Sequence, residues 1–174
     1  MQLLRSAVLV LVVLIGSAPP ARAEGDAPIQ LALFSPVQIV PPEKSVTGVR
    51  INLLYGKNAN MTGLDWGLVN HATGSESALE IGFVNIVEGD FTGWQDGGFN
   101  WTKGSFTGLQ TGVYNGTESM HGVAFGWVNR TRSMRGFQLG LVNITETMNG
   151  LQVGAANIIQ KGKIPFLPIV NWSF

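Results

Sequence analysis

The sequence predicts an all-β protein in which an antiparallel meander closes into a small outer-membrane-type β-barrel of about 8 to 10 strands. Two observations lead to this fold class. A unit that contains glycine and asparagine recurs every 14 or 15 residues, with about nine copies between residue 48 and the C-terminus. Inside each unit, large apolar residues alternate with small or polar ones, which is the period of a β-strand. One strand per repeat follows, and a parallel β-solenoid is the alternative arrangement.

The first 23 residues have the composition of a signal peptide. Arg5 precedes the apolar run 7–15, and Ala21-Arg22-Ala23 supplies the small residues of a cleavage site. The apolar run is shorter than the roughly 20 residues that span a bilayer as a helix. We therefore expect an exported chain, with residues 24–47 as a lead-in that contains one possible strand and residues 48–174 as the repeat domain.

The repeat is clearest at residues 136–143, which read Gly-Phe-Gln-Leu-Gly-Leu-Val-Asn. With Gly136 as position 1, positions 2, 4 and 6 carry large apolar residues, and position 8 carries asparagine. Asparagine in front of a polar stretch closes turns through side-chain hydrogen bonds, so a turn is expected at each copy. The repeat asparagines are Asn70, Asn85, Asn100, Asn115, Asn129, Asn143, Asn157 and Asn171.

The two faces of each strand differ in bulk, and this difference predicts their orientation. Nine strands would place about 27 large side chains inside a closed barrel, whereas an eight-stranded barrel is filled by about 12. Positions 2, 4 and 6, such as Phe125 and Leu139, are therefore expected to face lipid. Position 3 then forms a polar layer in a narrow lumen, in which Arg50, Asp65 and Glu80 are expected to make a buried ion cluster. The predicted layer comprises Arg50, Asp65, Glu80, Gln95, Gln110, Gln138 and Gln152.

Barrel and solenoid share this repeat, and other features separate them only in part. Neighbouring repeats have equal lengths, which suits coils stacked in parallel, and Asp96 at an outward position is unfavourable in lipid. A solenoid coil must also return, and the return segment 144–148 has few apolar residues at alternating positions. We therefore expect antiparallel strands with Asn129 and Asn143 far apart, whereas a solenoid would stack them about 4.8 Å apart.

The C-terminus adds two resemblances. The ending Trp172-Ser173-Phe174 resembles the C-terminal signature of bacterial outer-membrane barrels, so Trp172 and Phe174 are the expected assembly signal. The repeat at 136–143 and the final residues Pro-Phe-Leu-Pro-Ile-Val-Asn-Trp-Ser-Phe also resemble an uncharacterised family of bacterial surface-repeat exported proteins. That likeness covers residues 29–174 and implies an envelope or cell-surface location, without any activity or binding residue.

Composition narrows the function classes. The chain has 11 basic and 11 acidic residues, no cysteine and two histidines. A basic nucleic-acid surface, thiolate chemistry and a histidine-rich metal centre therefore have little support. We expect no enzyme activity, no catalytic residue, no metal site and no cofactor.

The expected function is that of a bacterial envelope protein with a structural or surface-interaction role. Its expected partners are outer-membrane lipid and the outer-membrane assembly machinery. The alternatives are an exported β-solenoid that binds a partner through a flat repetitive face, and a small channel. The expected location is the outer membrane or the cell surface, with the periplasm or the medium as the alternative.

Overall fold

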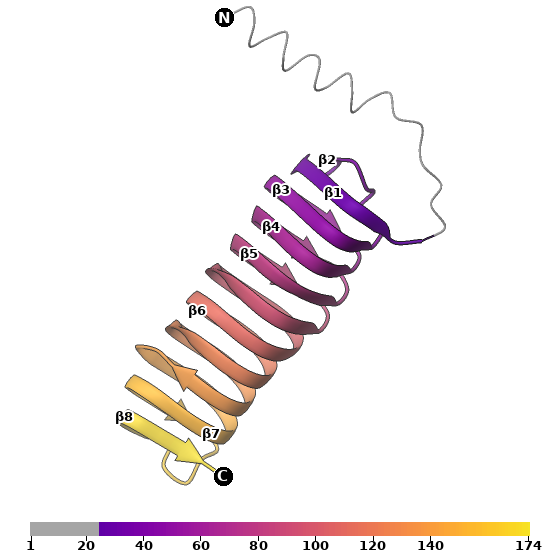
Figure 1. Cartoon of the computed structure of the whole chain (residues 1–174). Helices are drawn as coiled ribbons and strands as arrows, with labels where there is room; N and C mark the ends of the chain where they lie inside the picture. Colours follow the sequence, from indigo (N-terminus) through magenta and orange to yellow (C-terminus); the bar gives the residue numbers. More distant parts are fainter. Residues whose placement is uncertain (1–24) are drawn as a thin grey trace, which may run out of the picture.

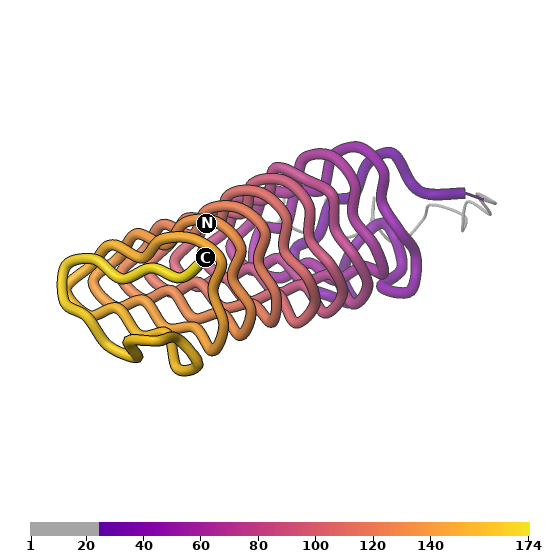
Figure 2. Tube along the Cα trace, turned by 90° about the horizontal axis from the view of Figure 1, so that it is seen from below, coloured from indigo at the N-terminus to yellow at the C-terminus, as the bar shows by residue number. Residues whose placement is uncertain are grey.

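The chain folds as a parallel β-solenoid, and Figure 1 shows its coils following one another along a single axis. This computed structural model describes residues 25–174, so the predicted signal peptide at 1–23 lies outside the described residues. The strands are β1 (Ala27–Phe34), β2 (Val37–Gln38), β3 (Val46–Asn58), β4 (Met61–Ala72), β5 (Glu76–Val87), β6 (Phe91–Leu139), β7 (Val142–Ile159) and β8 (Phe166–Ser173). The coils continue without interruption through the long β6, as the tube in Figure 2 shows.

The coils are parallel, so the predicted antiparallel meander and barrel are wrong. Each residue of β4 pairs with the residue 15 positions later in β5, as Asn70 pairs with Asn85. In the last coils the offset is 14, and Asn129 pairs with Asn143. A period of two fixes which side of a strand a residue occupies, but it is the same in parallel and antiparallel sheets. Equal repeat lengths were the better guide, because stacked coils must match in length.

Both ends of the stack are covered. Strand β1, within the lead-in, runs parallel to β3, and the short β2 folds back against β1. At the other end β8 pairs antiparallel with β7, from Leu151 opposite Trp172 to Ile158 opposite Phe166. These additions make the short β2 and the antiparallel β8 the edge strands of the sheet in place of the repeating coils.

Four columns of side chains fill the interior. Each column takes one residue from each coil, and nearly all of these residues are buried. We call them the glutamine column (Gln30, Arg50, Asp65, Glu80, Gln95, Gln110, Ala124, Gln138, Gln152), the asparagine ladder (Asn52, Asn70, Asn85, Asn100, Asn115, Asn129, Asn143, Asn157), the apolar column (Val46, Met61, Glu76, Phe91, Phe106, Met120, Met134, Met148) and the threonine column (Asn58, Ala72, Val87, Thr102, Thr117, Thr131, Thr145, Ile159).

The two repeat glycines make room for this packing. At position 1 the glycine turns the chain at positive φ, +134° at Gly136, and a Cβ there would collide with the carbonyl oxygen of Gly122 in the preceding coil. At position 5 a Cβ on Gly97 would collide with the side chains of Asn85 and Asn100. The space that we expected to remain as a lumen beside the position-5 glycines is therefore occupied by the asparagine ladder.

The return segment is also a strand, contrary to the expectation from its few apolar residues. Residues 144–148 lie within β7 and pair in parallel with the coil before them. They bury Thr145, whose hydroxyl donates to the carbonyl oxygen of Thr147 at 2.8 Å and has the carbonyl oxygen of Arg132 as a second acceptor within reach at 3.2 Å. A small side chain with a satisfied hydroxyl is enough, because the interior of so narrow a coil has little volume to fill.

Candidate interaction surface and buried charge cluster

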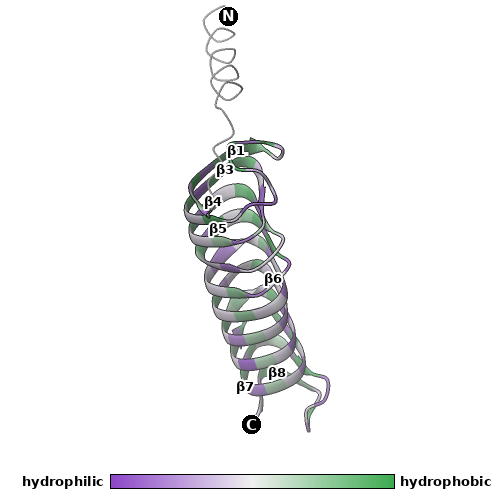
Figure 3. Cartoon of the chain, turned by 90° about the vertical axis from the view of Figure 1, so that its right-hand side faces the viewer, coloured by the Kyte–Doolittle hydropathy of each residue, from purple (hydrophilic) through white to green (hydrophobic). Residues whose placement is uncertain are grey.

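Positions 2, 4 and 6 form one continuous outward face of the solenoid, which we call the apolar face. The three columns begin in β1 with Ile29, Leu31 and Leu33, and they end in β8 with Trp172 and Val170. In Figure 3 the green segments recur from coil to coil along the stack. Many of the large side chains are strongly exposed, up to 66% at Phe83 and 65% at Trp127. The prediction that these positions point outward thus agrees with the structure, although the sheet is not a barrel.

Asp96 is the single charged residue in the three columns across residues 25–174. It is partly buried, and its carboxylate accepts a hydrogen bond from the hydroxyl of Thr111, which in turn accepts one from the indole of Trp94 at 3.1 Å. At this level Gly98 and Val113 replace larger residues, so the face is hollowed. The shallow groove of about 850 Å³ is lined by Gly98, Val113, Phe125, Trp127 and Leu141, among others.

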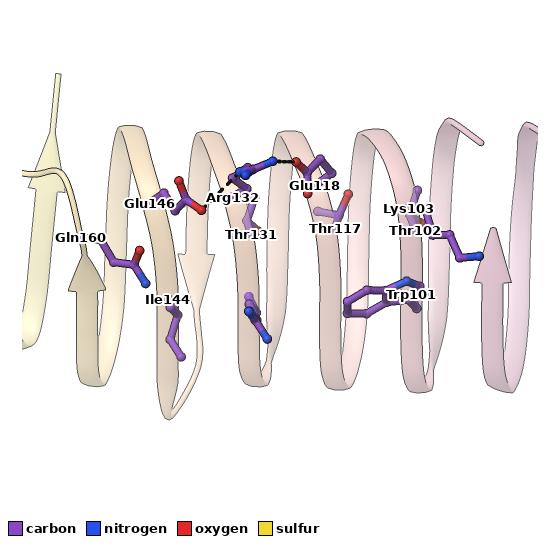
Figure 4. Close-up of a pocket in the computed structure, with 11 residues that line it drawn as sticks. Trp101, Thr102, Lys103, Thr117, Glu118, Thr131, Arg132, Ile144, Glu146 and Gln160 are labelled. Carbon is purple, nitrogen blue, oxygen red and sulfur yellow. Dashed lines mark hydrogen bonds and ion pairs between the residues drawn. The ribbon is translucent and has the colours of Figure 1, made fainter. Parts of the chain in front are cut away.

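The opposite face is polar, and several of its charges form ion pairs. Arg132 bonds to Glu118 and lies 3.2 Å from Glu146, whose other oxygen is 3.0 Å from Lys161. Figure 4 shows Arg132 between the two glutamates, above a groove of about 470 Å³ that also contains Trp101 and Lys103. The hydrogen bond from Lys161 lowers the pKa of Glu146. We interpret this row as a solvated ladder of opposite charges between successive coils.

All seven residues of the predicted polar layer lie in the glutamine column and are fully buried. In the later coils they link through side-chain amides, as Gln110 donates to Gln95 and Gln152 donates to Gln138, at 2.7 and 2.8 Å. Ala124 interrupts the series, and the Oε1 of Gln110 has no partner within the described chain. These residues lie inside a packed coil rather than around a lumen.

In the first coils the same column is charged. Two guanidinium nitrogens of Arg50 donate hydrogen bonds to the carboxylate of Asp65. The third nitrogen donates to the carbonyl oxygen of His71 at 3.1 Å. Glu80 lies one coil beyond Asp65. Glu76, which sequence reasoning missed, reaches the cluster from the apolar column, with its Oε2 at 3.6 Å from the Arg50 guanidinium. The only signal in the sequence was the break that Glu76 makes in a column of valine, methionine and phenylalanine.

Burial dominates the electrostatics of this cluster. It raises the pKa of Glu76 and of Glu80 well above the ordinary value, and neighbouring carboxylates raise both further. Burial lowers the pKa of Arg50, but Asp65, Glu76 and Glu80 together raise it by more. Interior charges of this kind are costly unless each has a partner.

Seven of the eight predicted turn asparagines form the asparagine ladder, which begins with Asn52 in place of a repeat asparagine. From Asn52 to Asn143 each Nδ2 donates to the Oδ1 of the next asparagine at 2.8 to 3.0 Å. From Asn70 onward each Nδ2 also donates to a backbone carbonyl of the following coil, as Asn129 does to Leu139 at 3.0 Å. Asn171 lies in β8, where its Nδ2 donates to the carbonyl oxygen of Ile164 at 3.2 Å.

The two residues of the predicted assembly signal lie at the end of the chain. Trp172 is on the apolar face opposite Leu151, and Phe174 follows β8 and is largely exposed. Among residues 25–174, no helix is long and apolar enough to cross a membrane. The sequence matches no protein-family model, and no curated protein or solved structure matches it either.

Proposed function

We propose that this protein is an exported, non-enzymatic envelope component that lies on a lipid surface through its apolar face. The observation that carries the proposal is the size and continuity of that face. About ten strands at a spacing of about 4.8 Å, each contributing five residues of about 3.3 Å, give roughly 800 Å². The largest apolar patch of a typical soluble monomer is about 300–600 Å², and larger ones mark protein or membrane contacts.

The distribution of side chains favours lipid over a protein partner. The apolar side chains continue from β1 to β8 on both sides of the groove beside Asp96, so they extend along the whole length and are not gathered at one centre. Protein interfaces concentrate their binding energy in a few central residues surrounded by a polar rim. Four of the five tryptophans, Trp66, Trp94, Trp127 and Trp172, are exposed on this face, and tryptophan is enriched where protein meets the membrane interface.

The apolar face and the polar face also differ in charge, as expected for a sheet that lies on a membrane surface. Salt bridges connect Glu118, Arg132, Glu146 and Lys161 on the polar face, whereas the apolar columns contain Asp96 alone among charged residues of the described chain. A protein lying in the interface inserts its apolar side and keeps its charges in water. The predicted signal peptide would bring the chain to the compartment where this contact is made.

The test is flotation of the exported protein with vesicles of phosphatidylethanolamine and phosphatidylglycerol, some with brominated acyl chains. We expect the protein to float and its tryptophan fluorescence to be quenched. Trp127→Glu should lower the partition coefficient at least tenfold, because an exposed apolar ring is replaced by a charge. Gln160→Glu adds the same charge on the polar face and should change binding little.

Two results would count against lipid as the partner. One is a chain that stays with the aqueous fraction at every vesicle composition. The other is a face-to-face dimer in solution that Trp127→Glu dissociates, because the apolar face would then be covered by a second copy.

A further inference from the structure

The interior of the first coils departs from the repeat in a coordinated way. Arg50, Asp65 and Glu80 stand where later coils have glutamine or alanine, and Glu76 stands where the other coils have valine, methionine or phenylalanine. All four side chains are buried, with exposures of 0 to 2%. Four departures in neighbouring coils bring three carboxylates and one guanidinium into a single cluster.

One part of this cluster is complete by itself. Arg50 Nε donates to Asp65 Oδ1 at 2.8 Å, and a second guanidinium nitrogen bonds to Oδ2. Asn52 Nδ2 also approaches Asp65 Oδ1, at 3.2 Å. This bidentate pair balances one positive with one negative charge and satisfies the polar atoms of both groups.

The two glutamates are not balanced. Gln95 donates to Glu80 Oε2 at 2.7 Å, but within residues 25–174 Glu80 Oε1 and both oxygens of Glu76 accept no hydrogen bond. In the described part of the chain, the only cation beside Glu76 is Arg50, which lies 3.6 Å away and is already bonded to Asp65. With all three carboxylates ionised, the cluster has two excess negative charges, which a low-dielectric interior does not tolerate.

The three carboxylates converge, and those of Glu76 and Glu80 bring the oxygens without partners. One oxygen from each of Asp65, Glu76 and Glu80 lies within 4.8 Å of the other two. Calcium accepts irregular, all-protein oxygen sites, whereas magnesium demands near-octahedral geometry and usually keeps several waters, so an enclosed cluster of carboxylates suits calcium. We propose that a calcium ion binds inside the solenoid between Asp65, Glu76 and Glu80 and neutralises the two excess charges.

The proposed site is a structural one that is independent of the apolar face. Its ligands come from β4 and β5, so the ion ties two successive coils near the N-terminal cap. Because the ligands are enclosed, the ion is taken up as the coils form rather than exchanged at a surface. Protonation of Glu76 and Glu80 is the competing way to remove the charge, and burial raises the pKa of both.

The experiment measures metal content and thermal stability of the full chain expressed with its own leader and purified after export. The protein is unfolded, then refolded in 1 mM CaCl₂ or in EDTA. We expect about one calcium per chain after gel filtration and a midpoint of unfolding about 5 to 10 °C higher with calcium. Glu76→Gln and Glu80→Gln keep the side-chain shape and should each abolish the bound calcium and the calcium-dependent shift.

Both variants should fold even in EDTA, because the neutral amide removes one of the excess charges. Loss of calcium binding can therefore be distinguished from failure to fold. Glu118→Gln, which removes an exposed carboxylate of the polar face, is the matched control and should keep both calcium and the shift. No calcium in the wild type, with Glu76→Gln raising the midpoint equally in both buffers, would overturn the proposal in favour of protons. Retention of magnesium or manganese but not calcium would overturn the assignment of the ion.

Discussion

The first coils and the later coils share one backbone and differ in what fills it. From Val46 to Val87 the interior contains a guanidinium and three carboxylates, whereas from Phe91 to Ile159 it contains amides, hydroxyls, methionine and phenylalanine without a charge. The stacked rings of Phe91 and Phe106, 4.8 Å apart, mark the beginning of the neutral part. The same backbone repeat thus accommodates either a charged or a neutral interior.

Contacts that occur in both regions define the coil, and contacts that occur in one region are local. The asparagine ladder and the position-5 glycines continue through both regions, so they belong to the coil itself. The charges occur in one region, so they are an addition to the coil. The following predictions separate the two contributions.

The largest effect is expected from Arg50→Met. This change removes the one cation from among three buried carboxylates, and breaking a buried pair in this way costs about 3–5 kcal/mol. The free energy of unfolding, measured by urea denaturation with circular dichroism, should fall by this amount. Gln138→Met, at the same place in a neutral coil, should cost about 1–2 kcal/mol because it removes amide hydrogen bonds only. Equal losses would contradict the distinction between the regions.

Loss of one asparagine should cost the same in both regions. Asn70→Ala and Asn143→Ala each remove a rung that receives one ladder bond and donates two more. Each variant leaves buried polar groups without partners, so we expect a loss of about 2–3 kcal/mol in unfolding free energy. A much larger loss for Asn70 would mean that the charged coils depend on the ladder in a way that the neutral coils do not.

Ala124→Gln should stabilise the neutral region. Gln110 Oε1 has no partner in the described chain, and a glutamine one coil later is in register to donate to it, as Gln110 itself donates to Gln95. We expect a gain of about 1 kcal/mol in urea denaturation. Destabilisation would show that the side chains around the buried Ala124 have already filled this space.

The smallest effect concerns His71, at the edge of the charged region. Burial lowers its pKa, while Glu88, 3.0 Å from Nε2, raises it, and Lys57 and Lys103 lower it. The folded chain therefore favours the neutral ring, whose Nδ1 is 2.8 Å from the hydroxyl of Tyr55. The stability from the neutral ring is complete above the unfolded pKa of about 6.5 and is lost as the pH falls through the lower folded pKa.

Unfolding free energies between pH 7.5 and pH 5 measure this contribution. The wild type should lose more stability than His71→Gln over that interval, and the difference isolates the ring from the carboxylates. A steeper loss in the variant would reverse the sign and show that His71 is held protonated.

Much of the fold could be predicted from the repeat. The inward and outward assignment followed from bulk alone, because three large residues per strand do not fit inside a narrow closed structure. Strand direction could not be obtained in this way, since Leu139 points outward in either arrangement. The return strand was missed because a buried Thr145 with a satisfied hydroxyl reads as a polar loop in the sequence.

The charge cluster was predictable only in part. Arg50, Asp65 and Glu80 occupy one repeat position, so their proximity followed from periodicity. Glu76 belongs to another column, and it meets them only because a narrow coil brings its two interior sides together. The groove at Gly98 depends on side chains from several coils, which no single repeat unit contains.

The side-chain amides of the asparagine ladder and of the glutamine column are aligned in opposite directions along the solenoid axis. From Asn52 to Asn143 each ladder asparagine donates toward the C-terminal end, as Asn100 does to Asn115, whereas glutamines of the other column donate toward the N-terminal end, as Gln110 does to Gln95. The amide dipoles of the two rows therefore oppose each other, but seven asparagine bonds outnumber three bonds of the glutamine column, so the asparagine direction prevails along the axis. The glutamine row of residues 80–110 ends on Glu80, so its positive end is delivered to a carboxylate.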